Sequence, residues 1–174
     1  MIRRLAIHKL REWRYSEDRK PLIIRGVRQV GKTTLVKEFA KEFDVFLHLN
    51  LERSKDSELF EQTDDVAQLL QSIYYHKKQE QKDGSVLLFI DEIQNSKKAV
   101  AMLRYFYEEA PEVHVIVAGS LLETVMDVRK ISFPVGRVEF MSLRPCSFLE
   151  FLGGLGEDFD KELVENFNVE SVVH

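Results

Sequence analysis

The sequence predicts an α/β domain in which a parallel sheet of about five strands lies between two layers of helices. Short apolar runs alternate along the chain with segments whose apolar residues recur at helical spacing. The short runs are apolar throughout rather than at every second residue, which is typical of parallel strands buried on both faces. Because crossovers between parallel strands are right-handed, this alternation predicts a three-layer α/β fold with an N-terminal helix.

Five runs fit the strand pattern. In chain order they are 22–24, 45–49, 86–90, 113–118 and a weaker run at 140–143. Helical stripes precede or separate them at 2–14, 35–43, 66–74 and 99–110. Thr63, Asp64 and Asp65 supply a capping signal before the third helix, and Pro111 ends the fourth because its ring cannot continue a helix. A further helix is expected to begin near Pro145.

The composition indicates a folded domain with a core of its own. The chain has 174 residues, of which 44% are hydrophobic and 31% charged, unlike disordered or fibrous proteins. No apolar run approaches the ~18 residues that a membrane-spanning helix needs. The basic N-terminus lacks the apolar segment of a secretion signal, and Cys146 is the sole cysteine, so no intrachain disulfide forms. A cytoplasmic protein outside the membrane is therefore expected.

Charge is distributed unevenly along the chain. The net charge is −4, yet residues 1–32 hold ten Lys and Arg against three Asp and Glu, whereas residues 33–174 hold 15 against 26. A basic N-terminal helix followed by the cations of a phosphate site explains this asymmetry. A surface that faces DNA is the alternative. The negative net charge favours the first explanation, because nucleic-acid-binding domains are usually strongly basic.

Residues 26–33 match the phosphate-binding pattern G-x-x-x-x-G-K-[ST] without a mismatch, between a strand-like run and a helical stripe. The glycines let the backbone curl so that successive N–H groups face phosphate oxygens, and the helix N-terminus adds partial positive charge. We expect Lys32 to reach the β- and γ-phosphates and the Thr33 hydroxyl to bind Mg²⁺. The residues predicted to contact nucleotide are Gly26, Val27, Arg28, Gln29, Val30, Gly31, Lys32, Thr33 and Thr34.

Two carboxylates, Asp91 and Glu92, follow the strand 86–90. Ligands of parallel sheets bind at the carboxyl edge, where Asp91 is expected to hold Mg²⁺ through its water shell. Glu92 is expected to orient and polarise the water that attacks the γ-phosphate. A solvated turn explains an isolated Asp-Glu pair, but its place after the phosphate loop favours catalysis. No Asn-Lys-x-Asp motif for guanine occurs, so ATP is the expected nucleotide.

Four motifs occur in chain order: RGVRQVGKTT at 25–34, FIDEIQ at 89–94, AGS at 118–120 and VGR at 135–137. Together they resemble a family of prokaryotic ATPases of the AAA superfamily. The segment 145–151 also resembles the one that follows in those proteins, so the likeness covers residues 2–152. It implies a P-loop ATPase domain with one strand between the phosphate-loop strand and the Asp-Glu strand. It also implies a longer parent protein, with residues 1–152 as the ATPase domain and 153–174 as a linker into a further C-terminal region.

The resemblance implies two more roles, each with a structural alternative. Ser120 matches a polar sensor of the γ-phosphate, whereas capping of a helix that begins at Leu121 is the alternative. Arg137 matches an arginine finger offered to a neighbouring subunit's nucleotide, and Arg129 is the competing finger. An ion pair with Glu139 or another surface acid is the alternative for Arg137. A finger that acts in trans implies self-association and slow hydrolysis by an isolated monomer.

Five further side chains are considered for a role in the site. Three of them have both a functional and a structural interpretation, and the two histidines have a structural interpretation only. Gln94 has a γ-phosphate contact by the same resemblance, or it begins a solvated helix. Trp13 and Tyr15 either stack on adenine or pack in the core. His48 and His114 are interpreted as packed or edge histidines, because no neighbouring Cys, His or Asp spacing indicates a metal site.

The sequence therefore predicts an ATP-binding, Mg²⁺-dependent ATPase whose hydrolysis drives a conformational or assembly switch. The predicted catalytic residues are Glu92, Lys32, Arg137 and Ser120, and the predicted metal ligands are Thr33 and Asp91. One alternative is a nucleotide-gated module that binds DNA or protein with little or no turnover. The second is a small-molecule or nucleotide kinase. A kinase needs an arginine-rich lid over the phosphates, and the region of Arg129 and Lys130 is too sparse to form one.

Overall fold

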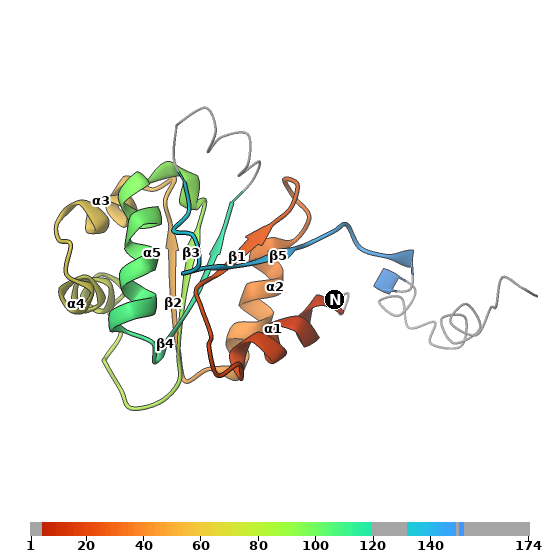
Figure 1. Ribbon diagram of the computed structural model, residues 1–174, viewed down its shortest axis with the longest axis horizontal. Helices are drawn as coiled ribbons and strands as arrows, with labels where there is room; N and C mark the ends of the chain where they lie inside the picture. The colour runs from red at the N-terminus through yellow and green to blue at the C-terminus, as the bar shows by residue number, and fades with distance from the viewer. Residues whose placement is uncertain (1–4, 120–131, 149, 152–174) are drawn as a thin grey trace, which may run out of the picture.

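The computed structural model describes residues 5–119, 132–148, 150 and 151 (Figure 1). Its strands are β1 (Leu22–Arg25), β2 (Val45–Asn50), β3 (Val86–Asp91), β4 (Val113–Ala118) and β5 (Glu139–Ser142). Its helices are α1 (Ala6–Arg14), α2 (Lys32–Phe39), α3 (Ser54–Glu61), α4 (Val66–Lys77) and α5 (Lys97–Glu109). Two 3-10 turns, η1 (Ala40–Glu42) and η2 (Ile93–Asn95), follow α2 and β3. The predicted alternation of strands and helices is confirmed.

The five strands form one parallel sheet in the order β2-β3-β4-β1-β5. Strand β4 lies between β1 and β3, as the resemblance implies. Because all the strands point the same way, the loop after β1 and the carboxylates that end β3 meet at the same edge of the sheet. We call this edge the carboxyl edge.

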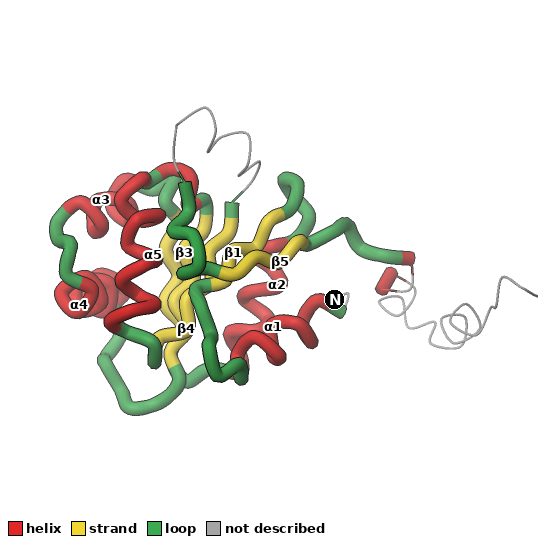
Figure 2. Tube along the Cα trace, viewed as in Figure 1, coloured by secondary structure: helices red, strands yellow, loops and turns green. Residues whose placement is uncertain are grey.

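Helices cover both faces of the sheet, so the predicted three layers are present. Helices α1 and α2 lie on one face and α3, α4 and α5 on the other (Figures 1 and 2). Each face has its own apolar cluster, and β3 and β4 are buried along their whole length because both faces are covered. The segment after β5 returns to the start of α1, where the Leu5 N–H donates to the Glu150 carboxylate at 2.8 Å.

The elements differ from the sequence-based expectation in one main respect. The sequence does not predict α3, because Leu59 and Phe60 are its only large apolar residues and Asp56, a charged residue, is also buried. The expected helix near Pro145 is described only at residues 148, 150 and 151. Within the described ranges the longest helix, α5, has 13 residues, and none is long and apolar enough to cross a bilayer.

Candidate active site

The loop from Gly26 to Gly31 joins β1 to α2 in a tight curl. Gly31 precedes α2 with φ of 94°, a left-handed conformation that favours glycine. Gly26 is required for a different reason, because a Cβ there would lie 2.5 Å from the carbonyl oxygen of Leu143. The Leu143 N–H donates to the Arg25 carbonyl at 2.7 Å. The segment after β5 therefore packs directly against the start of the loop.

Lys32 opens α2, and its side chain is folded back onto the loop. Its Nζ donates to the carbonyl oxygens of Gly26 at 2.7 Å and Val27 at 3.0 Å, and the residue is 6% exposed. Burial lowers the pKa of Lys32, and the nearby charges of Glu92 and Asp91 oppose that shift. The first N–H groups of α2 have no intrahelical acceptor, as in every helix. An ammonium group and the N–H donors of the first turn of α2 thus lie together at the carboxyl edge.

Thr33 and Asp91 connect the loop to β3. The Thr33 hydroxyl, in α2, donates to Oδ2 of Asp91 at 2.7 Å. Asp91 ends β3, and β4 lies between β3 and the strand β1 that precedes the loop. Asp91 is 7% exposed; burial raises its pKa, and the hydrogen bond from Thr33 opposes that shift. A hydroxyl and a carboxylate oxygen at this spacing are the hard donors that Mg²⁺ prefers. Among the described residues, no cluster of three or more His, Cys, Asp or Glu could hold a metal ion.

Glu92 follows Asp91 with an unusual backbone conformation. Its φ of 54° lies in the left-handed region, which residues other than glycine adopt at a cost and mostly near functional sites. Its N–H donates to Oδ1 of Asp91 at 3.1 Å. Nε2 of Gln94, in η2, donates to Oε2 of Glu92, and Gln94 is 7% exposed. The solvated-helix interpretation of Gln94 is therefore wrong.

The comparisons with known proteins agree with this geometry. The family model described as "AAA domain" matches residues 18–152. The chain belongs to the AAA domain family. Among solved structures, the Walker-type ATPase PABY2304 of Pyrococcus abyssi has 19% sequence identity and a TM-score of 0.55, and the match covers 95% of this chain and 63% of that chain.

The fold of this AAA domain is thus that of a P-loop ATPase, and the predicted resemblance is confirmed. The domain spans about 63% of the length of the Pyrococcus ATPase. A comparison with curated proteins gives no match.

His48 of the AAA domain lies closer to the site than the sequence indicates. Its ring stacks between Phe46 and Phe89 at centroid distances of 5.9 and 5.0 Å, so the packed interpretation is correct. Its Nε2 also lies 4.0 Å from Oδ2 of Asp91, and burial lowers the pKa of His48 to about 4. The register pairs His48 with Phe89, two residues before Asp91. Sequence reasoning missed this neighbour because it depends on which strand adjoins β3.

Arg137 of the AAA domain lies at the opposite edge of the sheet from the loop. It precedes β5, and its Nε donates to Oε1 of Glu108, near the end of α5, at 2.8 Å. The sequence offers Glu139 or another surface acid as its partner, and the acid is Glu108. Arg137 therefore does not belong to the site that its own chain builds. Ser120 and Arg129 lie outside the described residues.

Trp13 packs in the core of the AAA domain. Its indole N–H donates to the Lys20 carbonyl at 2.8 Å, and its ring contacts Phe39 and His114 at centroid distances of 6.5 and 6.0 Å. The core interpretation of Trp13 is correct. Tyr15, by contrast, is exposed beside the guanidinium of Arg14.

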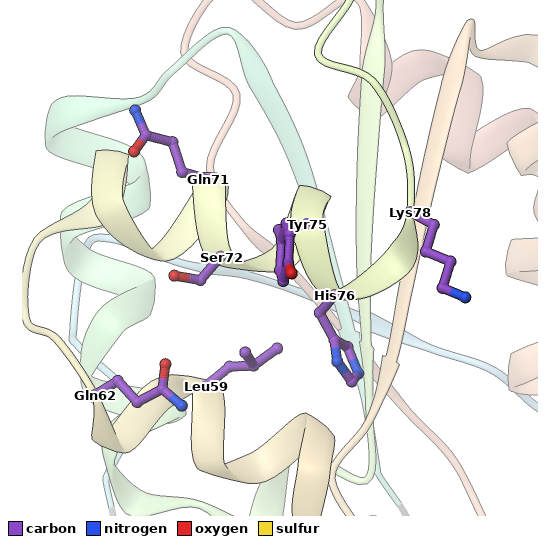
Figure 3. A pocket seen from close by; sticks show the side chains of 7 residues that line it. All are labelled: Leu59, Gln62, Gln71, Ser72, Tyr75, His76 and Lys78. Carbon is purple, nitrogen blue, oxygen red and sulfur yellow. The ribbon is translucent and has the colours of Figure 1, made fainter.

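A groove between α3 and α4 is separate from the site (Figure 3). Its lining residues are Leu59, Gln62, Gln71, Ser72, Tyr75, His76 and Lys78. His76 also bonds to the buried Asp56, whose other oxygen accepts the Asn50 N–H at 2.8 Å. The groove shares no residue with the loop or with the end of β3.

Proposed function

We propose that this AAA domain binds ATP with Mg²⁺, hydrolyses it and uses the hydrolysis to drive a conformational or assembly switch. The observation that carries the proposal is the 2.7 Å hydrogen bond between Thr33 and Asp91. It joins the two motifs at the carboxyl edge, where ligands of parallel sheets bind. The left-handed Glu92 lies directly beside it.

The loop and the start of α2 bind the phosphates. Backbone N–H groups of residues 26–34 donate to phosphate oxygens, with Lys32 as the added cation. Lys32 exchanges its contacts with the carbonyls of Gly26 and Val27 for charge-assisted bonds to the β- and γ-phosphates. The phosphate charge also offsets the burial that lowers the pKa of this lysine.

Thr33 and Asp91 hold the metal. A Mg²⁺ ion bound there would supply positive charge that offsets the negative charge of the phosphates. Thr33 supplies a hydroxyl and Asp91 a carboxylate whose desolvation the cation offsets. Glu92 orients the attacking water and accepts its proton, while the bond between the γ-phosphorus and the ADP oxygen breaks.

The test compares ATP turnover and nucleotide affinity of the wild type with those of Lys32→Ala and Glu92→Gln. Lys32→Ala is expected to weaken ATP binding about 10- to 100-fold, because a charge-assisted bond is lost. Glu92→Gln is expected to lower kcat about 10²- to 10⁴-fold at unchanged affinity, and EDTA to abolish wild-type turnover. The matched control is Glu12→Gln, at an exposed carboxylate of α1, which leaves turnover unchanged. Wild-type turnover by Glu92→Gln at unchanged affinity would contradict the proposal.

The basic N-terminal region does not favour the DNA-binding alternative. Arg11 pairs with Glu42 at 2.7 Å, and Arg14 donates to the Glu42 carbonyl at 2.8 Å. Arg19 donates to the carbonyl oxygens of Arg14 and Pro111. These cations stabilise loops at the amino edge of the sheet, which supports the structural explanation of the charge asymmetry.

A further inference from the structure

Gln94 and Glu92 form a side-chain pair that the proposed hydrolysis does not yet use. The Gln94 amide donates to one carboxylate oxygen of Glu92, and Gln94 itself is 7% exposed. Gln94 is itself held by the 3-10 turn η2, in which the Asn95 N–H donates to the Glu92 carbonyl at 3.1 Å. The neighbouring Ile93 is fully buried, so the turn is anchored in the core.

The backbone of Glu92 makes this contact reachable. Glu92 is left-handed, with φ of 54°, and the amide of Gln94, two residues later, reaches its carboxylate. The Glu92 N–H is fixed at the same time by Oδ1 of Asp91. Both the backbone and the carboxylate of Glu92 are thus held by immediate neighbours.

We propose that Gln94 is a positioning residue for ATP hydrolysis, because its amide holds the Glu92 carboxylate in one orientation relative to the attacking water. The inference rests on the proposed function. A glutamate side chain has several rotatable bonds, and a general base acts only within hydrogen-bond reach of the proton it accepts. Removing the amide lets the carboxylate sample orientations that miss the water.

This role differs from a γ-phosphate contact of Gln94 in what it predicts. A phosphate contact contributes to nucleotide affinity, whereas a contact with Glu92 contributes to the rate at which bound ATP is cleaved. Gln94→Met keeps the length of the side chain and removes the donor. We expect kcat to fall about 10-fold, with the ATP dissociation constant unchanged.

The experiment is a double-mutant cycle measured under single-turnover conditions with enzyme in excess over ATP. Gln94→Met is expected to have no further effect in a Glu92→Gln background, because the group that it positions is already lost. Gln94→Asn, whose shorter amide does not reach Glu92, serves as a second variant with the same expected loss. The matched control is Asn95→Ala, at an exposed side chain of the same turn, which is expected to match the wild type.

Three outcomes would overturn the inference alone: an unchanged kcat in both Gln94 variants, a proportional weakening of ATP affinity, or an equal loss in the Glu92→Gln background. The last outcome would assign Gln94 a structural role. A wild type without ATP turnover, at normal folding, would overturn the proposed function and this inference together. The two failures are thereby distinguished.

Discussion

Asp91 is a buried carboxylate at the end of β3. Burial raises its pKa, and the hydrogen bond that the Thr33 hydroxyl donates to its Oδ2 opposes that shift. An ionised carboxylate in this setting reduces the stability of the folded chain, and a divalent cation offsets the cost. The residue is therefore suited to ligand binding rather than to stability.

Asp91→Asn is expected to separate these two effects. Without nucleotide the variant should gain about 0.5–2 kcal/mol in free energy of unfolding, because a buried charge is removed. With ADP and Mg²⁺ the wild type should be stabilised and the variant much less. Chemical unfolding with and without ligand, and with EDTA added, measures both. Equal stabilisation of the two proteins by ADP and Mg²⁺ would argue against the assigned metal ligand.

His114 is a buried histidine in β4, in the core of the domain. Its Nδ1–H donates to the Val86 carbonyl at 3.2 Å, and its ring meets Phe43 edge-on at 4.9 Å. Burial lowers the pKa of His114 to about 4. The unfolded chain therefore binds a proton between about pH 6.5 and pH 4 that the folded chain does not.

This difference predicts an acid-sensitive stability. The contribution of His114 is fully present above about pH 6.5 and is lost as pH falls toward 4, by at most ~1.4 kcal/mol per pH unit. His114→Phe should lack this component, so the difference between wild type and variant should shrink steadily over that interval or change sign. Urea unfolding at pH 7, 6 and 5 provides the measurement. Parallel pH profiles of the two proteins would refute the assignment.

At the scale of elements, the loop depends on β5 as well as on β1. The segment after β5 approaches Gly26 so closely that a methyl group has no room beside the Leu143 carbonyl. Gly26→Ala should therefore lower the free energy of unfolding by about 1–3 kcal/mol and weaken ATP binding, because the loop must shift. Glu12→Gln, at an exposed carboxylate of α1, is the control. Thermal unfolding and nucleotide titration test both, and a wild-type affinity in Gly26→Ala would contradict the expected shift.

Most elements follow from sequence because their signals are local. The runs of β3 and β4 are apolar because both faces are covered, and the predicted cap of α4 forms when Asp65 accepts the Gln68 N–H at 2.9 Å. The apolar pattern of β5 is weaker because β5 is the last strand in the sheet order and is only partly buried.

The rest of the site depends on geometry that is not local. The meeting of the loop with Asp91 follows from the rule that parallel strands end at one edge. The nearness of His48 requires the register of β2 on β3. The Gln94 contact occurs beside the left-handed conformation of Glu92, which no residue pattern in this segment indicates.

At the scale of the molecule, the phosphate loop proposed to bind nucleotide and Arg137 lie at opposite edges of the sheet. Arg137 is bonded to Glu108 near the end of α5. An arginine there serves a neighbouring subunit's nucleotide if subunits associate head to tail. The proposed finger thus predicts that hydrolysis depends on protein concentration.

Specific activity should rise with protein concentration, and Arg137→Ala should lower kcat by about 10³-fold or more. A mixture of Arg137→Ala with Lys32→Ala should regain activity, because one chain contributes the loop and the other the arginine. Arg104→Ala, which removes the other partner of Glu108, is the control and should resemble the wild type. Concentration-independent turnover without rescue in the mixture would exclude the finger.

The two carbonyl contacts of Lys32 have a consequence for how the ligand enters. By bonding to these two carbonyls, the Lys32 side chain keeps the phosphate loop curved. The loop is therefore preorganised, and little backbone ordering is expected when nucleotide binds. Nucleotide binding then requires a change in the position of the Lys32 ammonium group rather than a rearrangement of the whole loop. Even Lys32→Arg, which preserves the charge, would replace the compact ammonium group by a wide planar guanidinium. The loop would then be distorted even without nucleotide.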